Sequence, residues 1–280
     1  MANDILNIAG FSIIKRLGTG AKSTIYMATD LQNEQPIALK RVIYEKPEDC
    51  RIFQQVETEY KVARQIDHPY VRKCYKLKKK RSFLMTKELL LSMELFDGKT
   101  LEETPPLSLI DVLLVFRMVA TGLHAMHQKG LVHCDIKPNN ILMNKSGSVK
   151  IIDLGQSCKI GTVKQRIQGT PDYIAPEQVM RKPLGPKTDV FNLGATMYWA
   201  LTGRNIPTLI PKKDAHGLAI PQKKKSPRDL KKQIPEEISK FVMDCVEEDP
   251  SLRPKNMMAL ISRLDVIIHG ILGDRVKTNQ

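Results

Sequence analysis

The stretch His133-Cys134-Asp135-Ile136-Lys137-Pro138-Asn139-Asn140 is followed, after twelve intervening residues, by Asp153-Leu154-Gly155. Together the two segments supply carboxylates, a carboxamide and an ammonium group. Carboxylate and carboxamide oxygens are ligands that Mg²⁺ accepts, a further carboxylate can orient an attacking hydroxyl, and a lysine can balance charge on a transferred group. This combination is typical of sites for phosphoryl transfer.

Toward the amino terminus, a strand predicted at Ser12–Leu17 runs into Gly18-Thr19-Gly20-Ala21-Lys22-Ser23. Glycine between two strands lets backbone N–H groups approach phosphate oxygens without an intervening Cβ, although such hairpins are also structurally commonplace. Twenty residues after Gly20, Lys40 ends an apolar segment and can neutralise phosphate charge. Glu59, in the next predicted helix, can hold that lysine in an ion pair.

The hydrophobic periodicity changes along the chain. Short β-rich runs predict strands, and one longer period predicts a helix at Cys50–Gln65. The strands are expected at Ser12–Leu17, Thr24–Thr29, Pro36–Ile43, Arg81–Met85 and Leu89–Leu95. Beyond Gly98 we expect helices at Ser108–His127, Asp189–Leu201, Pro235–Glu247 and Lys255–His269, with a surface loop at Ile206–Gln233. A sheet-rich block followed by a helix-rich block favours two lobes with a ligand cleft.

The formal net charge is +14, from 44 Lys+Arg against 30 Asp+Glu, which favours polyanionic partners or simply a solvated surface. The basic runs Lys76–Arg81 and Lys223–Lys232 lack interleaved aromatic residues, so a solvated face or a docking surface for an acidic partner is favoured over nucleic acid or membrane. Charged residues interrupt the apolar stretches Leu107–Leu123 and Met257–Leu272, which therefore predict buried or amphipathic helices and no membrane span.

The five cysteines are scattered and form no CxxC pair, so neither a disulfide framework nor a zinc site is predicted. No secretion signal is visible and Ala2 occupies the place of a myristoylated glycine, so we expect a cytoplasmic location. His124 and His127 could hold a metal, but packing is favoured because no third ligand is near. We expect His133 to be a core residue and the thiol of Cys134, beside Asp135, to be unreactive.

In the order and spacing of these motifs, the sequence resembles the eukaryotic-type protein kinase family over roughly Phe11–His269. The resemblance implies an α+β, two-lobed fold with a small β-rich N-lobe at 11–95 and a mainly helical C-lobe at 96–270. Residues 1–10 would be an N-terminal extension, 153–177 the activation segment and 271–280 a C-terminal tail. Lys137 and the Gly169-Thr170-Pro171 stretch before Ala175-Pro176-Glu177 are similar to the serine/threonine branch.

The resemblance implies ATP with Mg²⁺, or Mn²⁺ in its place, and a protein substrate. Asp135 is implied as the catalytic base, Asn140 and Asp153 as metal ligands, and Met93 as the gatekeeper before a hinge at Glu94–Phe96. The other catalytic residues would be Lys137, Lys40, Glu59 and Thr170, and Asp189 and Arg253 match two buried charged anchors. The nucleotide contacts would be Leu17, Gly18, Thr19, Gly20, Ala21, Ser23, Ile25, Ala38, Lys40, Met93, Glu94, Leu95, Phe96 and Leu142.

Three positions depart from the family pattern. Ser23 replaces the third glycine of the phosphate loop, and Leu154 replaces the phenylalanine of Asp-Phe-Gly; nucleotide binding and packing should survive both changes. Cys134 replaces an arginine that in relatives receives an activation-segment phosphate. We expect activity to be independent of that style of phosphorylation, with the segment ordered by packing, by a partner, or by phosphate held on Lys159, Lys164 or Arg166.

Asn139 and Thr100 stand where arginine-directed relatives carry acidic residues, which favours acidic or neutral target sequences. Two other classes of protein stay open as alternatives: a pseudokinase that binds nucleotide or a partner without transfer, and a small-molecule kinase on a related fold. The intact catalytic set argues against the first, and Lys137 with the Ala-Pro-Glu segment argues against the second. The substrate, pathway, organism, activating signal, oligomeric state and presence of further regulatory regions are not encoded in recognisable motifs.

Overall fold

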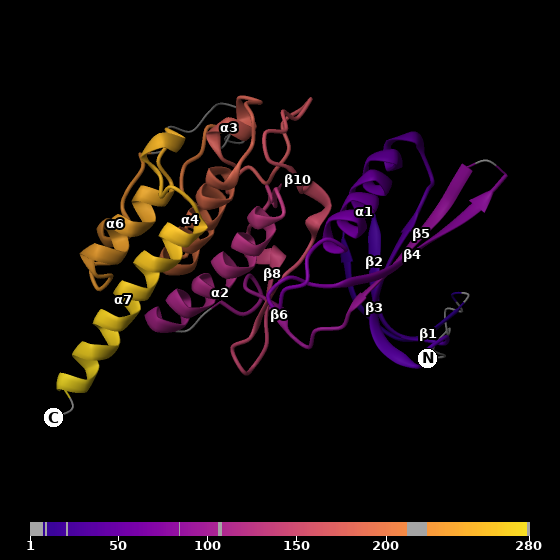
Figure 1. Cartoon of the computed structure of the whole chain (residues 1–280), viewed down its shortest axis with the longest axis horizontal. Helices are drawn as coiled ribbons and strands as arrows, with labels where there is room; N and C mark the ends of the chain where they lie inside the picture. Colours follow the sequence, from indigo (N-terminus) through magenta and orange to yellow (C-terminus); the bar gives the residue numbers. More distant parts are fainter. Residues whose placement is uncertain are drawn as a thin grey trace, which may run out of the picture. The chain divides into compact units, whose positions relative to one another are not determined.

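The computed structural model describes residues 8, 10–20, 22–83, 85–105, 108–211 and 223–278, with side chains as far as 272 (Figure 1). These residues form two compact units. The first comprises Met1–Asp67, Val71–Asp97 and Asp153–Gly155, and the second comprises His68–Tyr70, Gly98–Ile152 and Gln156–Gln280. The first unit is rich in strands and the second in helices, which confirms the expected change of character along the chain.

The first unit is built on a five-stranded antiparallel sheet with the order β1-β2-β3-β5-β4. Its strands are β1 (Phe11–Gly20), β2 (Ser23–Asp30), β3 (Gln35–Ile43), β4 (Cys74–Ser82) and β5 (Met85–Glu94). A 3₁₀ turn, η1 (Pro47–Asp49), leads into helix α1 (Cys50–Ala63), which packs against β4 and β5 (Figure 1). The apolar face of α1 buries Phe53, Val56 and Val62, and burial of this face stabilises the helix on the sheet.

One predicted strand of this unit is wrong. Arg81–Met85 spans the end of β4, the turn and the first residue of β5, and Phe83 in the turn has a positive φ of 51°. The basic run Lys76–Arg81 belongs to β4. Because β4 is an edge strand, charged side chains can occupy most of its positions, and this hides the apolar alternation that marks a strand.

The second unit contains the helices α2 (Leu109–Gln128), α3 (Pro176–Val179), α4 (Pro186–Thr202), α5 (Pro227–Leu230), α6 (Glu236–Cys245) and α7 (Met257–Thr278). Helix α2 begins at the cap Ser108, whose hydroxyl accepts a hydrogen bond from the Asp111 amide. It packs against α4 and α7 (Figure 1). Helix α2 is long and apolar enough to cross a membrane, but half of its apolar window is buried, as expected of a core helix.

The connections between the helices of this unit contain short strands and 3₁₀ turns. Strands β6 (Lys99–Thr100), β8 (Ile141–Met143) and β9 (Val149–Ile151) form one small sheet, and β7 (Leu131–Val132) pairs with β10 (Cys158–Lys159). The 3₁₀ turns η2 (Pro138–Asn140) and η4 (Pro250–Leu252) lie in this unit, whereas η3 (Leu154–Gln156) begins in the first unit and ends in the second. The catalytic-type motif of residues 133–140 therefore lies between β7 and β8.

The expected loop Ile206–Gln233 needs a correction, because its last part contains the short helix α5. Pro227 occupies the first turn of α5 and the hydroxyl of Ser226 caps it, which are local start signals for a helix. Residues 212–222 of the predicted loop lie outside the described residues.

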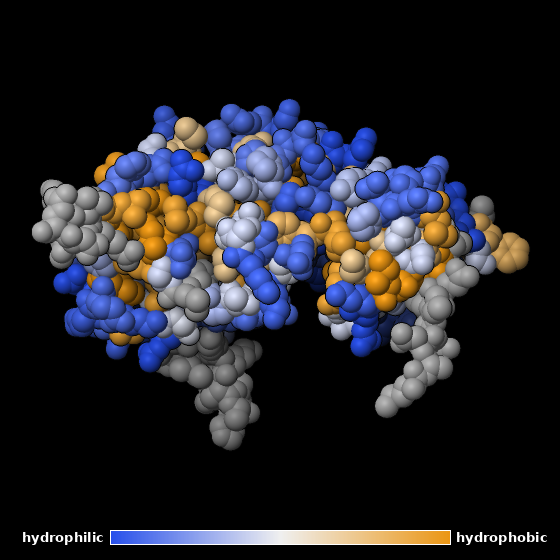
Figure 2. Space-filling view, turned by 90° about the horizontal axis from the view of Figure 1, so that it is seen from below, coloured by the Kyte–Doolittle hydropathy of each residue, from blue (hydrophilic) through white to orange (hydrophobic). Residues whose placement is uncertain are grey.

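The surface is mainly polar, as expected from the charge of the chain. Figure 2 shows blue side chains over much of the visible face, with areas of orange side chains on both units. The large exposed apolar side chains of α2 and α7 include Leu114, Val266 and Leu272.

Candidate active site

The Gly-rich segment is the hairpin between β1 and β2, in which Gly18 pairs with Ile25 and Gly20 with Ser23. A Cβ on Gly18 would meet no heavy atom within 4 Å, and its φ lies outside the left-handed region, so neither packing nor backbone conformation requires glycine there. The missing side chain leaves room for a ligand to approach the backbone. Leu17 and Thr19 are exposed beside it, and Ala21 lies outside the described residues.

Beside the tip of the hairpin, the ammonium of Lys22 pairs with the carboxylate of Asp49, immediately before α1. Asp49 also accepts hydrogen bonds of 2.9 Å from the backbone amides of Glu45 and Lys46. The hydrogen bond from Lys22, with these amides, lowers the pKa of Asp49 to about 2. The pair links the phosphate-loop hairpin to the start of α1.

Lys40 on β3 lies within an ionic network of the first unit. Its Nζ is 2.7 Å from Glu59 Oε2 and 3.8 Å from Asp153 Oδ1. Burial alone lowers the pKa of Lys40, but the carboxylates of Glu59 and Asp153 outweigh that effect and raise it. The lysine therefore stays charged, as binding of phosphate requires.

Arg72 is a further member of this network, and no sequence motif indicates it. Arg72 Nη2 lies 3.5 Å from Glu59 Oε1, so Glu59, which is 1% exposed, holds two cations. Arg72 lies in the irregular segment between α1 and β4, and nothing in the sequence identifies it as a partner of Glu59. Only the fold brings the guanidinium to the carboxylate.

The predicted hinge region begins at the end of β5. Met93 pairs with Ala38 in the sheet and both are buried. The backbone amide of Glu94 donates a 2.9 Å hydrogen bond to the Lys73 carbonyl, and Leu95 and Phe96 follow as half-buried, irregular residues. In the second unit, Leu142 lies half-buried on β8.

The second unit holds the predicted catalytic base in a triangle of side chains. Asp135, 5% exposed, accepts a 2.9 Å hydrogen bond at Oδ1 from the Thr170 hydroxyl. The same hydroxyl oxygen accepts a 2.8 Å hydrogen bond from Lys137 Nζ, which is also 3.3 Å from Asp135 Oδ2. Thr170 comes from a segment 35 residues away, so the fold joins the activation segment to the catalytic loop at this point.

Asn140 completes this group. Its Nδ2 donates a 2.7 Å hydrogen bond to the Asp135 backbone carbonyl, and this bond orients the amide and leaves Oδ1 as its acceptor atom. Cys134 and Asp153 both have positive φ values, of 67° and 60°. Backbone strain of this kind in non-glycine residues clusters at functional sites.

Asp189, in the first turn of α4, anchors the backbone of the loop that contains Asp135. Its fully buried carboxylate accepts hydrogen bonds from the amides of His133 and Cys134, at 2.9 and 2.8 Å, and lies 2.8 Å from His127 Nε2. Burial raises the pKa of Asp189, but His127 and the loop amides outweigh it and lower the pKa. The packing role expected of His127 is confirmed, and so is the core position of His133, whose Nε2 is 3.2 Å from the Ile152 carbonyl.

The activation segment is held by backbone pairing and buried polar contacts. Strand β10 pairs with β7, and Gln178 Nε2 donates to the carbonyls of Cys134 and Gln168, at 2.8 and 3.0 Å. The side chain of Cys134 lies in a small apolar cluster with Val132, Leu184 and Cys158. The side chain that directly precedes Asp135 is thus held by apolar contacts.

The end of the segment is fixed by a buried ion pair. Arg253 donates to both carboxylate oxygens of Glu177, at 2.8 and 3.0 Å, and stacks over Phe191. Bidentate pairing compensates the desolvation of the two charges. Glu177 is the glutamate of the Ala-Pro-Glu motif, so this anchor fixes the base of the segment in the helical unit.

The first unit holds the sheet-bound lysine with its glutamate, the second holds the hydrogen-bonded loop aspartate, and a strand-rich unit with a helix-rich unit is the make-up of the protein kinase fold. The profile of the protein kinase domain matches residues 11–263, and the chain belongs to this family.

Several curated serine/threonine-protein kinases of bacteria are similar to the chain. A probable kinase of Clostridium acetobutylicum is 24% identical over 277 residues, which cover 94% of this chain and 41% of that protein. PrkC of Bacillus subtilis is 25% identical, over 86% of this chain and 38% of its own length. PknL of Mycobacterium tuberculosis is 32% identical over 198 residues, or 67% of this chain and 48% of its own. The chain therefore spans less than half the length of each of these relatives.

Proposed function

We propose that the chain transfers the γ-phosphate of Mg·ATP to serine and threonine hydroxyls of protein substrates. The observation that carries the proposal is the triangle of Asp135, Thr170 and Lys137, in which a nearly buried carboxylate is oriented by a hydroxyl and flanked by an ammonium. A carboxylate in that setting can align an acceptor hydroxyl and take up its proton. The serine/threonine specificity rests on the relatives and on Lys137.

The described residues provide the groups that the nucleotide needs. The hairpin around Gly18 offers backbone N–H groups to phosphate oxygens, and Lys40 offers a charge that Glu59 orients. The Oδ1 of Asn140 and the carboxylate of Asp153, 43% exposed, are oxygen donors suited to Mg²⁺ or Mn²⁺. When bound, the metal neutralises charge on the phosphates during transfer. Catalysis by this chain is then mainly positioning and electrostatic stabilisation.

The alternative is a pseudokinase that binds nucleotide or a partner without transferring phosphate. The test measures nucleotide affinity and transfer of labelled γ-phosphate on the same samples of the wild type and Asp135→Asn. We expect nucleotide binding by both proteins and transfer by the wild type alone. If the wild type bound nucleotide but transferred no phosphate, and an added partner did not restore transfer, the pseudokinase would be favoured.

We further propose that activity does not need a phosphate paired with the residue before Asp135. The apolar setting of Cys134 and the hydrogen bonds of Gln178 support this, because they give the activation segment internal partners. Lys164, one of the cations considered for a phosphate, instead donates a 3.0 Å hydrogen bond to the Gln156 carbonyl.

Thr162 offers the test, since its hydroxyl donates to the Lys159 carbonyl at 2.7 Å within the segment. Thr162→Ala should keep most of the transfer activity, and Thr162→Glu should not increase it. Loss of activity in Thr162→Ala with recovery in Thr162→Glu would contradict the proposal.

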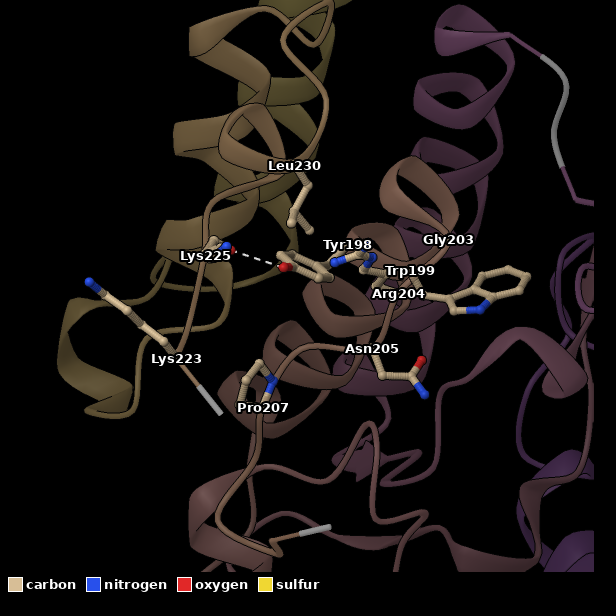
Figure 3. A pocket seen from close by; sticks show the side chains of 9 residues that line it. All are labelled: Tyr198, Trp199, Gly203, Arg204, Asn205, Pro207, Lys223, Lys225 and Leu230. Atoms are coloured by element: carbon tan, nitrogen blue, oxygen red, sulfur yellow. Dashed lines mark hydrogen bonds between the residues drawn. The ribbon is translucent and has the colours of Figure 1, made fainter. Parts of the chain in front are cut away.

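For the substrate, we propose targets with acidic or neutral residues around the acceptor and an acidic segment that docks near α5. A cavity of about 480 Å³ in the second unit is lined by three cations, Arg204, Lys223 and Lys225 (Figure 3). Asn205 in its wall accepts a 3.2 Å hydrogen bond from the Tyr173 hydroxyl, which links the cavity to the activation segment. Cationic side chains in a concave site favour carboxylates or phosphates.

Near Asn139 the structure shows an acidic side chain that the sequence pattern does not indicate. The amide of Asn139 donates to the carboxylate of Glu102, so an acidic side chain stands beside the neutral one. The preference therefore rests mainly on the cavity. An oriented peptide library should show enrichment of Asp and Glu that is lost when Arg204 and Lys225 are changed to Gln; enrichment of Arg before the acceptor would contradict the proposal.

We also propose a cytoplasmic location, on the pattern of scattered cysteines. Cell fractionation with antibody detection tests it, and recovery in the membrane or secreted fraction would contradict it.

A further inference from the structure

Two thiols meet beside the proposed catalytic base. Cys134 Sγ lies 3.8 Å from Cys158 Sγ, and both residues are free cysteines. Cys134 directly precedes Asp135, while Cys158 lies on β10 opposite Val132 of β7. The antiparallel pairing of β7 and β10 places the two thiols together, although 24 residues separate them in the chain.

The two thiols differ in exposure and acidity. Cys134 is 2% exposed, and its hydrogen bond to Cys158, with burial, raises its pKa. Cys158 is half-buried, and the hydrogen bond from Cys134 lowers its pKa to about 7, with Lys164 and Thr162 acting in the same direction. Because the thiolate is the nucleophile, Cys158 is the reactive member of the pair.

We propose that Cys158 is a site of oxidation by hydroperoxides and that Cys134 resolves it as an intramolecular disulfide. The Cys158 thiolate attacks one peroxide oxygen, the O–O bond breaks, and the departing hydroxide takes a proton to form water. Cys134 loses its proton and attacks the resulting sulfenic acid, forming the S–S bond and releasing the second water. Two thiols and one hydrogen peroxide thus give one disulfide and two waters, and a dithiol reverses the reaction.

The geometry determines which residue must move. A disulfide requires a sulfur separation of about 2.05 Å, so the thiols must approach from 3.8 Å. Two hydrogen bonds of 2.8 Å fix the backbone of Cys134. Its amide donates to the carboxylate of Asp189, and its carbonyl accepts from the side-chain amide of Gln178. The shift therefore falls on Cys158 and the start of the activation segment. This consequence rests on the proposed function, and it predicts slower phosphate transfer by the oxidised protein.

The chain carries its own control thiols. Cys50 is exposed, outside the pair, on the first turn of α1. Cys74 and Cys245 are buried, and burial raises the pKa of each to about 12, so they should stay reduced. Comparison with Cys50 separates selective chemistry at Cys158 from simple exposure.

The test treats the full chain with hydrogen peroxide and maps it by mass spectrometry without reduction. We expect a Cys134–Cys158 cross-link, with loss of about 2 Da, in the wild type and in Asp135→Asn alike, so the result does not depend on kinase activity. In Cys134→Ser, Cys158 should persist as a sulfenic acid that dimedone traps, and in Cys158→Ser no cross-link should form. Oxidation of Cys50 alone, or a persistent Cys158 sulfenic acid in the wild type, would overturn the proposal.

Two further readouts test the pair, and the first of them does not require the disulfide to form. Alkylation of wild-type Cys158 by iodoacetamide should rise with pH around a midpoint near 7; in Cys134→Ala, which lacks the S–H donor, the midpoint should move up toward about 8.5. Equal alkylation midpoints for the two proteins would contradict the role of Cys134. Phosphate transfer by the oxidised wild type should fall about five-fold and return with dithiothreitol; unchanged transfer by fully cross-linked protein would refute the effect on activity.

Discussion

The two units hold their functional groups in different ways. In the first unit, Lys40, Glu59 and Arg72 come from separate elements and are joined by charge. In the second, Asp135 and Asn140 lie in one short loop whose backbone is fixed by hydrogen bonds to the buried Asp189. The position of Lys40 thus depends on the placement of a helix, whereas the loop of Asp135 depends on local geometry and one buried anchor.

The largest expected effect on the rate of phosphate transfer comes from a change in the loop that contains Asp135. Asp135→Asn keeps the shape of the side chain but removes the proton acceptor, so the rate of phosphate transfer should fall by about 10²- to 10⁴-fold. Steady-state assays with a protein substrate measure the change. Asp244→Asn, which alters a surface ion pair with Arg263, is the control and should keep the wild-type rate. A loss of less than tenfold in Asp135→Asn would break the assignment of the base.

Next comes the ionic network of the first unit. In Glu59→Gln, Lys40 and Arg72 would face each other without a carboxylate, and the unfolding free energy should fall by about 3 kcal/mol. Chemical denaturation measures this change. The matched control on the same helix is Glu57→Gln, which alters the more exposed pair with Lys79 and should cost about 0.5 kcal/mol or less. Equal costs for the two variants would show that α1 is not held by this network.

A smaller effect is expected at the contact between loop and activation segment. Thr170→Val removes the hydroxyl that bonds Asp135 and Lys137, so transfer should slow by about tenfold, the equivalent of one hydrogen bond. Thr170→Ser keeps the hydroxyl and should restore most of the rate. If serine and valine behaved alike, the hydroxyl would have no part in positioning Asp135.

The smallest effect concerns the hairpin of the phosphate loop. Lys22→Met removes the cation beside Asp49, so the pKa of Asp49 should rise from about 2 toward its ordinary value of about 4. The depressed pKa stabilises the folded state above about pH 4, and this advantage is lost as the pH falls toward 2. Carboxyl chemical shifts in an NMR titration measure the pKa. An unchanged value would mean that the backbone amides alone set it.

The sequence predicted those parts of the molecule that follow local rules. The helices containing Glu59 and Asp189 lie where the apolar period predicts them, and the Gly18 hairpin follows from glycine between two strands. The edge strand β4 escaped prediction because lysines fill its exposed positions. The sequence therefore predicts a strand at Arg81–Met85, where the structure has the end of β4 and the first residue of β5.

The contacts that could not be predicted join residues far apart in the chain. No motif marks Arg72 as a second partner of Glu59, because that contact depends on the path of the chain between α1 and β4. The sequence places the thiol of Cys134 only beside its chain neighbour Asp135, whereas the fold brings it to 3.8 Å from the thiol of Cys158 across the β7–β10 pair. Such contacts are set by tertiary packing and carry no local signal.

Phosphorylation of serine and threonine by this chain is tested most directly by phosphoamino-acid analysis of the wild type and generic protein substrates after incubation with γ-labelled Mg·ATP. We expect label on phosphoserine or phosphothreonine and none on phosphotyrosine. Label on phosphotyrosine, or no label while nucleotide remains bound, would contradict it.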